Sequence, residues 1–254
     1  MRLLTLLLTL IPCWTLAQPL LPFEAEYRIH VSRIPTPIKA TLALVHGDSD
    51  NQFQMSFQTR SLMMRNREES TFQWNSCSPR SESYTHEFRG FGVRREHRMD
   101  FDWKDKEVRY QGGEGDIRYP INNGVLDELT MLLKAQCLFA EGLTQFTMEA
   151  AYGTKVRSHH FVVTGEELVR TPAGDVQTLV VEKRRRESSE RRTIFWVAPS
   201  LQYMLVKARH VENRALFGEL LMRSYDGPEP DESVAMPGKA KDDTPEDDVR
   251  PLEE

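Results

Sequence analysis

Apolar and polar residues alternate along most of this chain, and this alternation restricts its fold more than any other feature. The segment FEAEYRIHV (residues 23–31) places its apolar side chains on one face and its charged side chains on the other. Residues 38–46 and 53–59 repeat the pattern. A period of two residues is typical of a β-strand with one buried face and one face in water. These segments therefore predict half-buried strands.

Strand-like segments continue to about residue 225, joined by short turn sequences such as HGDSDN (46–51) and TPAGD (171–175). Short links between successive strands indicate an antiparallel sheet. About a dozen such strands curl into a barrel or partial barrel, or split into a sandwich. We predict a mainly β fold, an antiparallel meander that forms a barrel or half-barrel.

One segment, residues 125–141, has helical periodicity instead. Asn123 is the candidate N-cap, Asp127 and Glu128 fall in the first turn, and Gly142 is placed to end the helix. The apolar stripe of this segment is broad. A broad stripe indicates a helix packed against or into the sheet.

The first 17 residues resemble a secretory signal peptide. Arg2 precedes a short apolar core, and small residues end at Ala17. The alternatives are a retained anchor or buried helix, and a lipoprotein signal at Cys13, which Pro12 fits poorly. No later stretch is long and apolar enough to cross a membrane. We therefore expect an exported, periplasmic protein without a transmembrane segment after cleavage.

The last residues, 226–254, form an acidic segment with eleven acidic and three basic residues, five prolines and no aromatic residue. Such a composition cannot bury enough apolar surface to offset its chain entropy, so we expect a disordered tail. Its role is either that of a solubilising extension or that of an arm that binds a partner or inhibits the protein itself. Residues 18–225, with a net charge of +2, are then a single β-rich domain.

Removal of the leader leaves two cysteines, Cys77 and Cys137. In an exported chain two cysteines form either one disulfide or two separate buried thiols, and the sequence does not give their separation. A bridge would close a loop of roughly 60 residues and contribute about 4 kcal/mol in the chain-entropy description.

Three segments together resemble a known family: LDELTMLLKAQ (126–136), VTGEELVRTPAGDVQTLVVEKRR (163–185) and TIFWVAPSLQYMLVKARH (193–210). Their order and spacing are similar to those of a family of exported bacterial proteins known as domain of unknown function 3108. The resemblance covers about residues 23–225. It implies a periplasmic all-β protein, similar in shape to the lipoprotein-carrier half-barrels, and it supplies no catalytic residues.

Sequence motifs of common enzymes are missing. There is no Gly-x-Ser-x-Gly, His-Glu-x-x-His, Cys-x-x-Cys or phosphate-binding loop. His97 does not share a strand face with Asp100 and Asp102, so this group does not predict a metal site. We expect a non-catalytic protein without metal or cofactor, and a hydrolase remains the alternative that a buried carboxylate or histidine in a cleft would favour.

Large apolar side chains on the predicted sheet are the first candidates for ligand binding. They either line a lipid cavity in a partly open barrel or simply fill the core. The candidate lining residues are Phe53, Phe57, Trp103, Phe195, Trp196 and Tyr203. Within TIFWVAP, Phe195 and Trp196 point to opposite faces, so one of them borders any cavity.

Two arginine groups are the second candidates. One group, which includes Arg184 and Arg186, flanks the predicted hairpin tip RESSER (186–191), and the other is Arg89, Arg94, Arg95 and Arg98. They either bind the anionic head of a lipid or envelope glycolipid, or form a solvated edge. Nucleic acid is not expected as a partner of an exported domain of almost neutral charge.

These observations support two hypotheses. The first is a non-catalytic periplasmic protein that binds or carries an apolar or amphiphilic envelope component. The second is an envelope structural or assembly factor that contacts a protein partner through strand edges or the acidic tail. A continuous internal cavity would favour the first hypothesis, and a filled core with an exposed strand edge would favour the second.

Overall fold

The computed structural model describes residues 19–32, 34–184, 191–213 and 215–231. The expected leader, residues 185–190, which include most of the predicted hairpin tip, and most of the acidic tail lie outside these ranges. The described elements are β1 (Phe23–Val31), β2 (Ile34–His46), β3 (Gln52–Arg60), β4 (Met64–Asn75), β5 (Ser78–Gly90), β6 (Val93–Asp102), β7 (Glu107–Gly112), β8 (Gly115–Pro120), α1 (Thr130–Ala140), β9 (Gln145–Tyr152), β10 (Lys155–Thr171), β11 (Gly174–Arg184), β12 (Arg192–Ala198), η1 (Pro199–Leu201), β13 (Met204–Asn213) and β14 (Leu216–Asp226).

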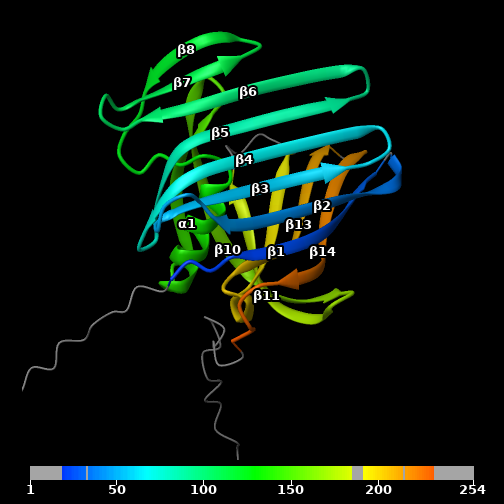
Figure 1. The fold of residues 1–254 in the computed structure, drawn as a ribbon. Helices are drawn as coiled ribbons and strands as arrows, with labels where there is room; N and C mark the ends of the chain where they lie inside the picture. Colours follow the sequence, from blue (N-terminus) through cyan, green and yellow to red (C-terminus); the bar gives the residue numbers. More distant parts are fainter. Residues whose placement is uncertain (1–18, 33, 185–190, 214, 232–254) are drawn as a thin grey trace, which may run out of the picture.

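The strands form one curved, fully antiparallel sheet in the order β8-β7-β6-β5-β4-β3-β2-β1-β14-β13-β12-β11-β10-β9. Strands that follow one another in the chain through a hairpin lie side by side in the sheet. The first strand, β1, pairs with the last strand, β14, in the middle of the sheet. The sheet does not close, because β8 and β9 lie at its two ends and are joined through α1 (Figure 1). The predicted antiparallel meander with one packed helix is confirmed, in its half-barrel form.

The connection between the two end strands bridges the open side of the sheet. Leu126 forms a parallel bridge with Ala150 of β9, through hydrogen bonds to the main chain of Glu149 and Ala151 at 3.0 and 2.8 Å. On the other side, the Tyr119 hydroxyl of β8 donates to the Gly153 carbonyl at 3.1 Å. These bonds place α1 on the concave side of the sheet.

The helix begins later than the sequence predicts. Asn123 does not cap it, because α1 starts at Thr130 and the side chain of Asp127 accepts the backbone N–H groups of Leu129 and Thr130 at 2.8 and 2.9 Å. The Thr130 hydroxyl accepts the Asp127 N–H in return at 2.9 Å. At the other end Gly142 has φ +81°, which glycine adopts without steric strain, and the helix ends as predicted.

The buried side chains form two clusters. The larger one joins inward residues of β1 to β7 to Leu129, just before α1, to Leu133 of the helix, and to residues of the last strands such as Met204 and Met222. The smaller one joins Phe139 to inward residues of β9 to β13, such as Phe161 and Val197. The helix therefore fills the space between the two halves of the sheet. No helix in the described ranges is long and apolar enough to cross a membrane.

Candidate functional site

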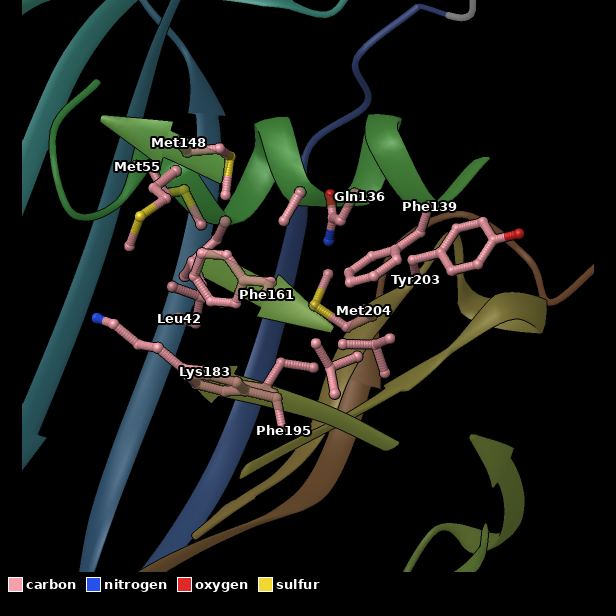
Figure 2. Close-up of a pocket in the computed structure, with 16 residues that line it drawn as sticks. Leu42, Met55, Gln136, Phe139, Met148, Phe161, Lys183, Phe195, Tyr203 and Met204 are labelled. Atoms are coloured by element: carbon pink, nitrogen blue, oxygen red, sulfur yellow. The ribbon is translucent and has the colours of Figure 1, made fainter. Parts of the chain in front are cut away.

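An apolar cavity of about 70 Å³ lies between α1 and the concave face of the sheet (Figure 2). Its lining consists of Leu42, Met55, Met131, Leu132, Ala135, Gln136, Phe139, Met148, Phe161, Val181, Lys183, Phe195, Val197, Tyr203, Met204 and Leu205. The lining comes from both halves of the sheet and from one face of α1. This cavity is therefore the interior of the half-barrel that the helix leaves unfilled.

Strand alternation decides which side chains reach the cavity. Phe195 and Val197 of β12 pair with Val181 and Leu179 of β11 and point inward. Trp196 lies between them on the opposite face. It is buried there, and its indole N–H donates to Glu167 at 2.8 Å.

Four methionines, Met55, Met131, Met148 and Met204, contribute to the lining. Methionine is unbranched and has a polarizable thioether, so it repacks around ligands of different shape at low energetic cost. A wall with this composition adapts to a flexible apolar ligand better than a wall of branched side chains.

A second cavity, of about 800 Å³ and lined mainly by polar and charged residues, includes Glu128, which precedes α1, and lies near one end of the strands. We call it the polar cavity. A cross-strand row on the concave face forms part of its wall, because Glu68, His86 and His97 stand opposite one another on β4, β5 and β6. Tyr84 and Glu128 complete this wall. At its edge are Tyr110, Tyr152, Arg94, Arg95, Glu96 and Glu114.

Hydrogen bonds join the wall of the polar cavity into one network. The Tyr84 hydroxyl lies 3.0 Å from Glu68 Oε2 and 3.2 Å from Glu128 Oε2. Asn66 donates to Glu68 Oε1 at 2.9 Å, and its own Oδ1 lies 2.6 Å from His86 Nε2. Because the Asn66 amide donates to Glu68, its oxygen faces the ring and His86 Nε2 carries the proton.

Three titratable groups in this wall have strongly shifted pKa values, and burial, followed by the nearby carboxylates, raises that of the Tyr84 hydroxyl. Burial, with the nearby carboxylate of Glu68 as the second cause, raises the pKa of Glu128 to about 7. Burial, helped by the neighbouring His86, lowers the pKa of His97 to about 4. Near neutral pH the wall therefore presents a neutral His97 and a Glu128 that is close to half-protonated.

Lys183 is a charged residue in the lining of the apolar cavity. It lies close enough to Glu128 of the polar cavity to oppose the rise in the pKa of that carboxyl group. Figure 2 shows its long side chain running along the cavity floor near Leu42. A cationic group of the apolar lining therefore interacts electrostatically with an acidic group of the polar lining.

Both ends of α1 are fixed to the sheet. At the N-terminal end, Asp127 is fully buried and its second carboxylate oxygen accepts the hydroxyls of Ser70 and Ser81 at 2.5 and 2.6 Å. At the C-terminal end, a disulfide joins Cys137 of the helix to Cys77 in the β4–β5 turn.

The residues named from the sequence divide between the cavity and the rest of the core. Phe195 and Tyr203 line the apolar cavity. Phe53, Phe57, Trp103 and Trp196 do not. Phe53 and Trp103 instead stack on neighbouring rings, Phe72 and Phe101. Phe57 packs against the larger cluster. On β3 the cavity is reached by Met55, which lies between Phe53 and Phe57, and on β12 Trp196 points to the face opposite the cavity.

The two arginine groups also separate. Arg184 is exposed at the end of β11, and Arg186 lies outside the described residues. In the second group, Arg94 and Arg95 border the polar cavity, whereas Arg89 is on the outer face.

Sequence reasoning missed the polar wall. Glu68 and His86 occupy inward positions of β4 and β5, where alternation predicts apolar residues. A polar residue at an inward position is the signal that could have identified them. Within the described residues, no group of three histidine, cysteine or acidic side chains has an arrangement that could hold a metal ion.

Comparisons with known proteins show the family of this chain and one solved structure of similar fold. The profile of the family described as "Protein of unknown function (DUF3108)" matches residues 26–214. A beta-barrel-like protein of the domain of unknown function DUF1849 from Brucella abortus is similar in structure, with a TM-score of 0.55 and 10% sequence identity over 82% of this chain and 98% of that chain. A DUF1329 family protein from Desulfovibrio piger aligns with a TM-score of 0.29 and 10% identity over 84% and 87% of the two chains. No curated protein matches the chain.

Proposed function

The chain belongs to the DUF3108 family of proteins of unknown function, and we propose that this member binds or carries an amphiphilic component of the cell envelope in the periplasm. The apolar part of the ligand would occupy the cavity under α1, and its polar head would lie in the adjoining polar cavity. The role is that of a binding protein and not that of an enzyme.

The observation that carries this proposal is the electrostatic interaction of Lys183, in the lining of the apolar cavity, with Glu128, in the lining of the polar cavity. An apolar cavity alone is compatible with imperfect packing. An apolar cavity and a second cavity lined mainly by polar residues, with a cation of one lining close to an acid of the other, match the chemistry of an amphiphile.

The apolar cavity is smaller than an acyl chain. Its volume of about 70 Å³ is below the roughly 150 Å³ of an engineered cavity that admits benzene. A chain of several carbons therefore enters only if side chains repack or α1 moves from the sheet. The four methionines of the lining allow the first, while the fixed ends of α1 restrict the second.

Native mass spectrometry of the exported chain, purified gently, tests the proposal. We expect a reproducible extra mass that fragments as a lipid or glycolipid. Ala135 faces the cavity from α1, so Ala135→Trp should fill the cavity and remove the extra mass. Ala135→Leu fills it partly and serves if the larger side chain impairs folding.

The matched control is Ala140→Trp, at the exposed end of the same helix. It should retain the ligand as the unaltered chain does. A bare protein mass, obtained with lipid available during expression, would contradict the proposal. It would favour the alternative of an envelope assembly factor, whose partner crosslinking would then identify.

The carboxylate pair favours a second candidate, hydrolysis of a bond in the head of the bound amphiphile. Glu128, with its pKa raised to about 7 by burial, can donate a proton near neutral pH, and Glu68 accepts the same Tyr84 hydroxyl beside it. Glu128→Gln would then hold an intact ligand where the unaltered chain holds a cleaved one. Identical ligand masses in both proteins would exclude this candidate.

A further inference from the structure

Six exposed basic residues stand opposite one another across six neighbouring strands. Each of these residues lies directly opposite the next one on the neighbouring strand, from β1 through β6. The members of this basic ladder are Arg28, Lys39, Arg60, Arg65, Arg89 and Arg94. The first five lie on the outer face, and Arg94, at the end of the row, also borders the polar cavity. Neighbouring strands are about 4.8 Å apart. The ladder is thus a continuous row of positive charge along one end of the sheet.

Direct opposition of like charges in a sheet is unfavourable, so an unbroken row is unusual without a partner. Among the described residues, Arg94 is neutralised by Glu96 at 3.0 Å. Within the residues that the structure describes, no ion pair within 4.0 Å involves Lys39, Arg60, Arg65 or Arg89. These four line a hollow of about 420 Å³, with Glu87 as its acidic lining residue. Most of the ladder therefore remains available to an anionic partner.

Apolar side chains project from the turns beside the ladder. Leu62 and Met63, in the β3–β4 turn, are 102% and 67% exposed, and Phe91, in the β5–β6 turn, is 60% exposed. They are the three most exposed large hydrophobic residues of the described chain. Arg60 and Arg65 flank the first turn directly. Both turns lie at the same end of the sheet (Figure 1).

The backbone holds these side chains outward. Phe91 has φ +52°, a conformation uncommon for a bulky residue, and Gly92 follows with φ +75°. In the other turn the Ser61 hydroxyl accepts the N–H groups of Met63 and Met64 at 3.3 and 3.1 Å. Both tips therefore have defined local structure that presents an apolar side chain to solvent.

We propose that this end of the sheet, the docking rim, binds the surface of an anionic phospholipid bilayer. Leu62, Met63 and Phe91 enter the interfacial layer, and the basic ladder contacts headgroup phosphates. A bilayer fits because it is flat and anionic, and it meets the ends of several hairpins at once. A pocket on a protein partner would instead receive one tip.

The docking rim goes beyond the proposed ligand function and does not depend on it. Arg94, a ladder member, also borders the polar cavity together with Arg95. Docking would therefore bring the opening of the polar cavity to the bilayer surface. A protein that docks but holds no ligand would retain this inference and contradict the proposed function.

Co-sedimentation of the exported chain with vesicles tests the inference. The vesicles are phosphatidylcholine alone, or phosphatidylcholine with about one third phosphatidylglycerol. We expect binding to the anionic vesicles only. The full chain has a net charge of -5, so binding to them would require a local basic surface. Raising the salt from about 0.1 M to about 1 M should release the protein, because the screening length falls from about 10 Å to about 3 Å.

Two rim variants and two matched controls identify the surface. Arg60→Gln, Arg65→Gln and Arg89→Gln together should weaken binding at least about tenfold. Leu62→Ser with Met63→Ser should also weaken it, but with little change in its salt dependence. The basic control is Lys104→Gln, Arg118→Gln and Arg170→Gln, and the apolar control is Leu168→Ser, all exposed and away from the rim.

All substituted side chains are at the surface, so a thermal melt should show that each variant remains folded. Absence of binding to anionic vesicles would overturn the inference. Equal losses in the rim and control variants would do the same, since binding would then not involve this surface. The inference would also be overturned if the protein bound an acidic protein from the envelope but did not bind vesicles, and if the rim variants retained that binding.

Discussion

The Tyr84 hydroxyl lies 3.2 Å from Glu128 Oε2, at the point where α1 meets the polar wall of the sheet. The same hydroxyl lies 3.0 Å from Glu68. One hydroxyl proton can serve only one acceptor at a time. Protonation of Glu128 would let both contacts persist, since its carboxyl group then donates to the Tyr84 oxygen. The raised pKa of Glu128, whose first cause is burial, is in keeping with this arrangement.

Stability should depend on the protonation of Glu128. Its pKa rises from 4.5 to about 7 on folding through burial, so the folded chain binds the proton more tightly. Its contribution to stability is therefore fully present below about pH 4.5 and is lost as the pH rises through about 7, by about 3 kcal/mol in all.

Urea unfolding of the unaltered chain and Glu128→Gln at about pH 5 and about pH 8 measures this contribution. Glutamine cannot ionise and still offers an acceptor to Tyr84. The unaltered chain should lose stability relative to the variant between the two pH values. If the difference in the free energy of unfolding between the two proteins were the same at both pH values, Glu128 would ionise in the folded chain as it does in water.

Asp127 should be a main determinant of how α1 is attached. Its carboxylate accepts two backbone N–H groups of the helix start and two serine hydroxyls, and the residue is fully buried. Asp127→Ala leaves these donors without their acceptor, and we expect a loss of at least about 3 kcal/mol. Chemical unfolding measures it, with exposed Asp175→Ala as a control that should change stability by less than about 0.5 kcal/mol.

The disulfide should stabilise the fold and fix the far end of α1. Cys77 and Cys137 close a loop with a sequence separation of 60, which corresponds to about 4 kcal/mol in the chain-entropy description. Cys77→Ser with Cys137→Ser should lower the free energy of unfolding by roughly this amount. Adding reductant should have the same effect on the unaltered chain and none on the double variant. Reductant effects of equal size in both proteins would argue against the disulfide as their cause.

The sequence predicts those features of the structure that depend on interactions between residues close together in the chain. The alternation that begins at Phe23 predicts strands because residues two positions apart in a strand share a face, so their polarity shows which face is buried. The sequence predicts a helix over residues 125–141 with Asn123 as its N-cap, whereas α1 begins at Thr130, because Asp127 bonds to Ser70 and Ser81 from distant strands. Local propensity does not contain that contact.

The polar wall and the basic ladder depend on strand register. Glu68 and Arg65 stand three positions apart on β4 and point to opposite faces, where one joins His86 and the other joins Arg89. Both look like ordinary polar strand residues in the sequence. Register is set by turn geometry and by packing across the whole sheet. The sequence alone therefore predicts strands, but not which polar residues face one another.

Phe195 and Trp196 are adjacent on β12 and should behave differently when replaced. Phe195 lines the apolar cavity, so Phe195→Ala should reduce retention of a bound lipid. Trp196 is buried on the opposite face, donates to Glu167 and lies under Lys207, whose Nζ is 4.5 Å from its ring centroid. Trp196→Ala should therefore lower the free energy of unfolding by about 3–5 kcal/mol. The protein that remains folded should still hold its ligand.

Native mass spectrometry gives the fraction of folded protein with ligand, and denaturant unfolding gives stability on the same preparations. The two variants should separate, with Phe195→Ala losing mainly ligand and Trp196→Ala losing mainly stability. Ala208→Gly, opposite Phe195 on β13, tests whether weakening the same sheet region is enough to release ligand. If all three variants lost ligand in proportion to stability, retention would reflect the integrity of the fold, and the cavity beside Phe195 would not be the binding site.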